Sequence, residues 1–76
     1  MIVYELPFKT VHRLMKQNTD CNLSHDSVEQ LILFLESVIK NVTISSSLYA
    51  DHDDRKTIDV EDINLAIRQI YFENKK

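Results

Sequence analysis

Apolar residues recur at helical spacing soon after the start of the chain. At about 100° per residue, Phe8, Val11, Leu14 and Met15 share one face of a helix. Pro7 fits the first helical position, where its missing N–H costs nothing. The pattern predicts a helix from Pro7 to about Asn18, ended by the polar residues 17–22.

The longest helical pattern follows and covers about 27 residues, from His25 to about Asp51. Ordinary globular helices have about 11–12 residues. Ser24 is a suitable N-cap, and Asp26 complements the helix dipole in the first turn. The apolar stripe comprises Val28, Leu31, Ile32, Leu35, Val38, Ile39, Val42, Tyr49 and Ala50. A sparser stripe of Leu33, Ile44 and Leu48 lies nearly opposite, so this helix is expected either to be sandwiched or to meet more than one partner.

A third helix is predicted after a short connection at residues 55–58. Asp59 is expected to cap it, with Asp62 three positions on as a variant of the capping box. Its inner stripe comprises Val60, Ile63, Ala66, Ile67 and Ile70. Residues 1–6 are interpreted as an extended lead-in, 7–70 as the folded domain, and 71–76 as a tail or helix extension. The chain has no glycine and one proline, which disfavours a β-fold with tight hairpins.

Length and cysteine content indicate that the chain needs a partner. A domain of 76 residues buries only about 60% of its unfolded surface. Cys21 is the only cysteine, so no disulfide can form within the chain, and no histidine–cysteine spacing is typical of zinc. Oligomerisation is therefore the expected source of stability.

Several function classes are disfavoured by the same sequence. A net charge of −3 and a pI near 5.5 argue against a general polycation. No continuous run of about 18 apolar residues or signal-peptide pattern is found, so a soluble, cytoplasmic protein without membrane association is expected. No spacing suggests a catalytic site, and without glycine there is no phosphate-binding loop. We expect no enzymatic activity, cofactor, metal or small-molecule substrate.

Specific segments carry a resemblance to a known family. They are Glu5-Leu6-Pro7, Arg13, Lys16, Arg55-Lys56-Thr57-Ile58, Glu61-Asp62-Ile63 and Leu65-Ala66-Ile67-Arg68. With these residues the chain resembles the minimal archaeal-type histones, which consist of the histone fold without tails. The resemblance implies an all-α histone fold, with a short, a long and a short helix, in an intertwined handshake dimer. The partner would be a second copy or a related histone subunit.

The resemblance also implies where double-stranded DNA would be contacted. Arg13 and Lys16 would reach phosphates from the first helix, and Lys56 and Thr57 from the second loop. Lys9 is added from helix geometry, because it shares a face with Arg13 and Lys16. Arg55 would pair with Asp62, as a structural ion pair that orients the loop, and its contact with phosphate would be secondary.

Two departures from the family pattern weaken the expected DNA contact. Asn22 occupies the position of an arginine that enters the minor groove in the family, as in nucleosomes. Asp51, Asp53 and Asp54 precede the second loop and oppose a phosphate. Each chain has five candidate cations, which are Lys9, Arg13, Lys16, Arg55 and Lys56, so a dimer has at most ten. If six to ten phosphates were neutralised, the affinity would fall about 10³–10⁵-fold as salt rises from 50 to 200 mM. Weak and strongly salt-sensitive binding is expected.

Two surfaces are candidates for further assembly. The resemblance implies that dimers join end to end through positions that match Tyr49, His52, Asp62 and Leu65. The stripe of Leu33, Ile44 and Leu48 could instead join dimers face to face. The hypothesis is a closed tetramer that holds or bridges DNA.

Two functions therefore stay open. One is a nucleoid-associated chromatin protein that binds duplex DNA without sequence preference. The alternative is an acidic histone-fold assembly module with little or no DNA binding.

Overall fold

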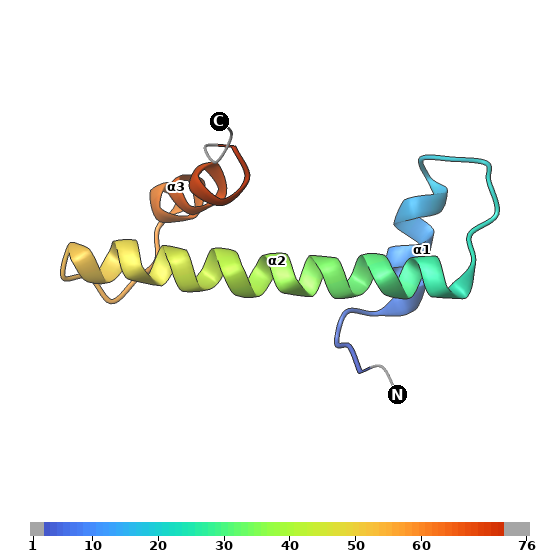
Figure 1. The fold of residues 1–76 in the computed structure, drawn as a ribbon, viewed down its shortest axis with the longest axis horizontal. Coiled ribbons are helices and arrows are strands. Elements are labelled where there is room, and N and C mark those ends of the chain that lie inside the picture. The colour runs from blue at the N-terminus through green and yellow to red at the C-terminus, as the bar shows by residue number, and fades with distance from the viewer. Residues whose placement is uncertain (1–2, 73–76) are drawn as a thin grey trace. The chain divides into compact units, whose positions relative to one another are not determined.

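The computed structural model describes residues 3–72, and within them the chain forms three α-helices and no strand. They are α1 (Phe8–Lys16), α2 (His25–His52) and α3 (Val60–Tyr71), labelled in Figure 1. Their lengths of 9, 28 and 12 residues give the expected order of a short, a long and a short helix. The predicted all-α fold class is confirmed. Of the predicted tail, Tyr71 belongs to α3, and residues 73–76 lie outside the described part.

The ends of α1 differ slightly from the prediction. Pro7 is the N-cap, one position before the helix, and its carbonyl accepts the first helical bond, from the N–H of Val11 at 3.1 Å. The helix ends at Lys16 instead of about Asn18. The reason is local: the Asn18 side-chain amide donates to the carbonyl of Leu14 at 2.9 Å, which satisfies a terminal carbonyl without another turn.

The long helix begins and ends with recognisable caps. The N–H of Ser27 donates to Oγ of Ser24 at 3.1 Å, as expected for an N-cap. At the other end Asp54 has a φ of 60°, the left-handed conformation. The N–H of Asp54 donates to the carbonyl of Asp51, and the N–H of Arg55 to that of Ala50, both at 2.9 Å. This is the Schellman pattern, with an aspartate where glycine is usual.

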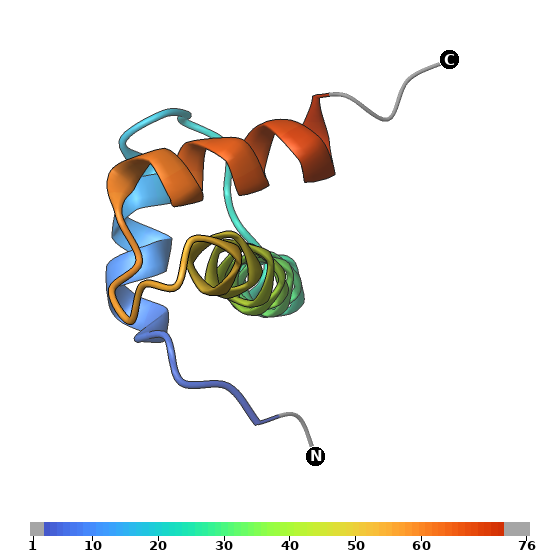
Figure 2. The same ribbon diagram turned by 90° about the vertical axis from the view of Figure 1, so that its left-hand side faces the viewer.

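Contacts along the chain divide it into two compact units, Met1–Ser37 and Val38–Lys76, with the boundary inside α2. We call them the N-terminal and the C-terminal unit. The buried core of the N-terminal unit is formed by Val11, Val28 and Ile32. Around it pack the partly buried side chains of Tyr4, Leu6, Phe8, Met15, Leu23 and Leu31. The extended residues before α1, blue in Figure 2, thus contribute Tyr4 and Leu6 to this core.

The buried residues of the C-terminal unit are mostly small. Ser46, Ala50 and Ala66 are 0–3% exposed, and Val42 is 8% exposed. Ser46 and Ala50 are one helical turn apart on α2, and small side chains there allow α3 to approach closely. The hydroxyl of Ser46 donates to the carbonyl of Asp62 at 3.3 Å, so the buried polar group is satisfied.

Apolar residues of all three predicted stripes stay exposed in the single chain. Leu14 of α1 is 49% exposed, Ile39 of α2 is 55% exposed and Val60 of α3 is 73% exposed. Each was expected on the inner face of its helix. One chain therefore leaves open apolar surface that a second subunit would have to cover.

By length and composition α2 could also cross a membrane, with a mean hydropathy of 1.4 over its most apolar 18 residues. The core helix of a soluble protein passes the same test. Glu36 and Lys40 lie in the middle of α2, and ionised side chains at that depth of a bilayer are costly. The hydropathy of α2 therefore carries no argument for a membrane.

Candidate nucleic-acid interface

The N-terminal unit presents three cations on one face of α1. Lys9, Arg13 and Lys16 are all exposed, on the side of the helix away from the buried Val11. Arg13 and Lys16 lie in the last turn, where cations complement the helix dipole. The first turn contains no acidic residue. This face could bind phosphates without a carboxylate of α1 beside it.

Lys16 also forms a hydrogen bond that the sequence did not predict. Its ammonium donates to the carbonyl of Cys21 at 2.9 Å, across the loop between α1 and α2. The same loop is held by Thr19, whose hydroxyl accepts from the N–H of Cys21 at 3.1 Å. Lys16 therefore fixes the loop that contains the exposed Asn22.

In the C-terminal unit, Arg55 lies at the centre of a cluster of carboxylates. Its guanidinium donates to Asp62 at 2.9 and 3.0 Å, to Asp53 at 3.2 Å and to Asp59 at 3.2 Å. It also donates to the carbonyl of Thr57 at 3.1 Å. Five acceptor oxygens from four residues surround one side chain that is only 33% exposed. Arg55 therefore holds the loop together, and its guanidinium is engaged by these acceptors.

The electrostatics of this cluster keep both partners charged. Hydrogen bonds to Asp62 and then to Asp53 raise the pKa of Arg55 above its ordinary value. The hydrogen bond from Arg55, followed by that from the N–H of Asp59, lowers the pKa of Asp62. The Asp62 side chain is only 3% exposed, so its charge depends on these donors.

Lys56 and Thr57 follow Arg55, and both are exposed. The exposed Asp51, Asp53 and Asp54 lie just before them in the chain. Asp53 is partly neutralised by Arg55, and Asp51 and Asp54 form no ion pair with any of the residues that the structure describes. The second loop thus offers one exposed lysine beside uncompensated carboxylates.

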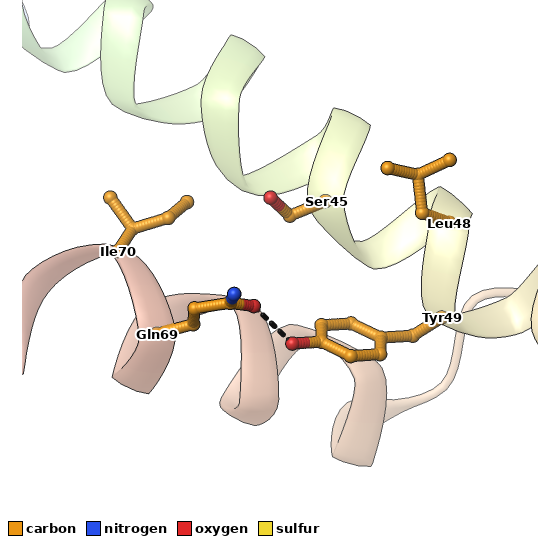
Figure 3. A pocket seen from close by; sticks show the side chains of 5 residues that line it. All are labelled: Ser45, Leu48, Tyr49, Gln69 and Ile70. Atoms are coloured by element: carbon orange, nitrogen blue, oxygen red, sulfur yellow. Dashed lines mark hydrogen bonds between the residues drawn. The ribbon is translucent and has the colours of Figure 1, made fainter. Parts of the chain in front are cut away.

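A shallow groove of about 410 Å³ lies between α2 and α3 of the C-terminal unit. It is lined by Ser45, Leu48, Tyr49, Gln69 and Ile70, drawn in Figure 3. The hydroxyl of Tyr49 donates to the side-chain carbonyl of Gln69 across the groove (Figure 3). Tyr49 therefore uses its polar end within its own unit.

The assembly candidates of the sequence differ in exposure. Ile44 is 53% exposed, Leu48 64% and Leu65 44%. The His52 side chain is 89% exposed and lies 3.7 Å from Asp53. Leu33 was expected at the surface with Ile44 and Leu48, but it is half-buried. The exposed part of that stripe in the C-terminal unit is therefore Ile44 and Leu48.

The helix order, the second-loop cluster and the cationic face of α1 together define a histone-fold chain. A family model described as "Histone-like transcription factor (CBF/NF-Y) and archaeal histone" matches residues 4–67. The match covers most of the chain, and the chain belongs to this family. Its members of the histone class are structural proteins, not enzymes.

Curated relatives agree with this assignment. The chain is 45% identical over 58 residues to DNA-binding protein HmvA of Methanocaldococcus jannaschii and 40% identical to its counterpart in Methanococcus voltae. These alignments cover 76% of the chain but only 60% and 59% of the relatives, which are longer. A polypeptide of the archaeal histone HAN1 from Thermococcus zilligii is 31% identical over 64 residues, which cover 84% of the chain and 96% of that protein.

Proposed function

We propose that the chain is a histone-like chromatin protein that binds duplex DNA through phosphate contacts, without reading base sequence. The observation that carries the proposal is the exposed cationic face of Lys9, Arg13 and Lys16 on α1. Lys56 and Thr57 would add contacts from the second loop. Two of the relatives are named DNA-binding proteins and a third an archaeal histone. A protein of this function would be associated with the nucleoid in the cytoplasm.

Binding of this kind would be weak and strongly dependent on salt. Because Arg55 is engaged with Asp53, Asp59 and Asp62, it is removed from the cations available to phosphate. Each chain then offers four candidates, which are Lys9, Arg13, Lys16 and Lys56. A dimer then offers eight candidate cations. The uncompensated carboxylates beside Lys56 further reduce the number that can contact phosphate.

The functional form is proposed to be a dimer, in which the partner is a second copy or a related histone. The exposed apolar residues Leu14, Ile39 and Val60 support this proposal, because each belongs to the inner stripe of its helix. Histones of the family pair in a handshake, which would cover surfaces of this kind.

We further propose that dimers join into a closed tetramer that bridges DNA segments instead of wrapping one. Ile44 and Leu48 are exposed apolar residues one helical turn apart on α2, and Leu48 also lines the groove of Figure 3. Tyr49, His52 and Leu65 are the alternative, end-to-end surface. Asn22 in place of the family's minor-groove arginine disfavours wrapping. A purely dimeric species by light scattering at micromolar concentration would contradict the tetramer.

A second candidate function is an acidic histone-fold assembly module that does not contact DNA. The observation in its favour is the second loop, where the exposed Asp51, Asp53 and Asp54 come just before the cations in the chain. Net charge also favours it, at −3 for the chain.

Charge reversal separates the two functions. Arg13→Glu and Lys56→Glu are each tested in a mobility-shift assay at low salt on two duplexes of unrelated sequence. DNA binding predicts a shift of both duplexes by the wild type and its loss in both variants, with nearly unchanged melting temperatures. An assembly module predicts no shift by any of the three proteins.

A further inference from the structure

One acidic side chain of α2 holds the residues that lead into α1. The Glu36 carboxylate accepts the backbone N–H of Glu5 at 2.5 Å and that of Leu6 at 2.8 Å. The two residues precede Glu36 by some thirty positions, so the contact is tertiary and not part of a helix. A carboxylate that accepts two N–H groups forms stronger, charge-assisted hydrogen bonds. We call this arrangement the lead-in clasp.

The lead-in clasp is supported by packing on either side. Tyr4 and Leu6 pack against the core of Val11, Val28 and Ile32. Burial, and then the charge of Glu29 on α2, raise the pKa of Tyr4. Glu29 precedes Glu36 by seven residues, which places both on the same side of the helix. The lead-in is thus fixed by apolar and polar contacts together.

Few backbone dihedral angles are free between the lead-in clasp and Lys9, which is the first cation of α1. Leu6 is held by Glu36, and the next residue is Pro7, whose ring fixes φ, here at −70°. The carbonyl of Pro7 then starts α1 by accepting the N–H of Val11. Lys9 lies in the first turn that follows. The orientation of the beginning of α1 is therefore coupled to Glu36.

We propose that Glu36 is a positioning residue for DNA binding, which orients the cationic face of α1 through the lead-in clasp. This inference rests on the proposed function of the chain. Glu36 itself would touch no DNA. Its role has an unusual electrostatic consequence: a negatively charged residue would strengthen the binding of a polyanion, because the order that its hydrogen bonds create outweighs the repulsion that its charge adds.

Whether replacing Glu36 raises or lowers the affinity for duplex DNA separates a positioning role from a simple effect of charge. Glu36→Ala removes a carboxylate, and by charge alone it should bind a duplex as well as the wild type or better. If Glu36 positions α1, Glu36→Ala should instead bind at least about threefold more weakly. Glu36→Gln keeps a carbonyl acceptor and should restore most of the affinity. Glu61→Ala is the matched control, since Glu61 is exposed and accepts no hydrogen bond among the residues that the structure describes.

Affinity is measured by fluorescence anisotropy on a labelled duplex, at a temperature where circular dichroism shows every variant to be folded. Hydrogen exchange of the Glu5 and Leu6 amides is followed in parallel. The expected result is faster exchange and weaker binding for Glu36→Ala only. A folded Glu36→Ala that binds as tightly as Glu61→Ala overturns the positioning role, as does equal weakening by Glu36→Gln. If the wild type binds no duplex, the proposed function has failed instead. Unchanged exchange of the Glu5 and Leu6 amides in Glu36→Ala would refute the lead-in clasp, whatever the affinity.

Discussion

Asp62 accepts hydrogen bonds from both terminal nitrogens of Arg55, at 2.9 and 3.0 Å, and also from the N–H of Asp59 at 2.9 Å. One carboxylate thus connects the loop after α2 to the first turn of α3. Asp62 as a whole residue is 2% exposed, whereas the side chain of Arg55 stays in contact with solvent. The pair fixes how the second loop enters α3, and with it the position of Lys56 and Thr57.

The first prediction concerns acid stability. The pKa of Asp62 is lowered in the folded chain, so its contribution to stability is present above its unfolded pKa of about 3.9 and is lost as the pH falls through the folded pKa. The wild-type melting temperature should therefore fall between about pH 5 and pH 2. Asp62→Asn should melt lower at neutral pH and show a smaller loss on acidification. Thermal melts by circular dichroism at a series of pH values test this; an equally steep acid loss in Asp62→Asn would exclude Asp62 as its source.

The second prediction separates conformation from charge at the end of α2. Asp54 has a left-handed φ of 60°, where glycine has no steric penalty. Asp54→Gly should therefore stabilise the fold by about 1 kcal/mol, a rise of about 4–8 °C in melting temperature. Asp54→Asn tolerates the same conformation and should leave the melting temperature nearly unchanged.

Both Asp54 variants remove a carboxylate two residues from Lys56. Both should therefore bind duplex DNA more tightly than the wild type, and by similar factors. A gain in affinity for Asp54→Gly alone, with none for Asp54→Asn, would show that loop conformation and not charge limits the contact.

The third prediction uses the salt dependence of binding. Each phosphate contact contributes about 0.9 to the slope of log affinity against log salt. Arg13→Gln removes one contact from each protomer, so the slope of a dimer should fall by about 2. Lys40→Gln is the control, because Lys40 is an exposed cation of α2 outside the candidate interface. Anisotropy titrations at four or more salt concentrations measure the slopes. An equal decrease for Lys40→Gln would mean that overall charge, not a defined face, determines binding.

The fourth prediction concerns assembly through the exposed edge of α2. Leu48 is 64% exposed, and Leu48→Gln should convert the proposed tetramer into dimers without loss of helix. Ser47→Gln is the control, since Ser47 is the exposed neighbour and carries no apolar surface. Light scattering after size exclusion gives the mass of each variant. If Leu48→Gln stays tetrameric while Leu65→Gln becomes dimeric, the end-to-end surface is the correct one.

Periodicity and capping residues allowed most of the fold to be predicted from the sequence. The three helices follow from apolar spacing, and the beginnings of α2 and α3 from Ser24 and from Asp59 with Asp62. The end of α1 was placed two residues too late. The side chain of Asn18 decides that boundary by binding the carbonyl of Leu14, and such local competition is not visible in a hydrophobic pattern.

The candidate site was less accessible from the sequence alone. The pairing of Arg55 with Asp62 came from the family resemblance, and the binding of Asp53 and Asp59 to the same guanidinium was not predicted. Their spacings of two and four residues from Arg55 were the available signal. Glu36 gave none, because its partners are backbone N–H groups distant in sequence. Leu33 looked equivalent to Ile44 by its angle around the helix, yet Leu33 is half-buried and Ile44 is exposed.

The most direct test of the account is sedimentation velocity of the chain with a labelled DNA duplex, at about 50 and 200 mM salt. By itself, the chain is predicted to sediment as a dimer or tetramer. It should bind the duplex in steps of that mass at the lower salt concentration and release most of the duplex at the higher salt concentration. A well-folded monomer, or a duplex that sediments free of protein at the lower salt, would contradict the account.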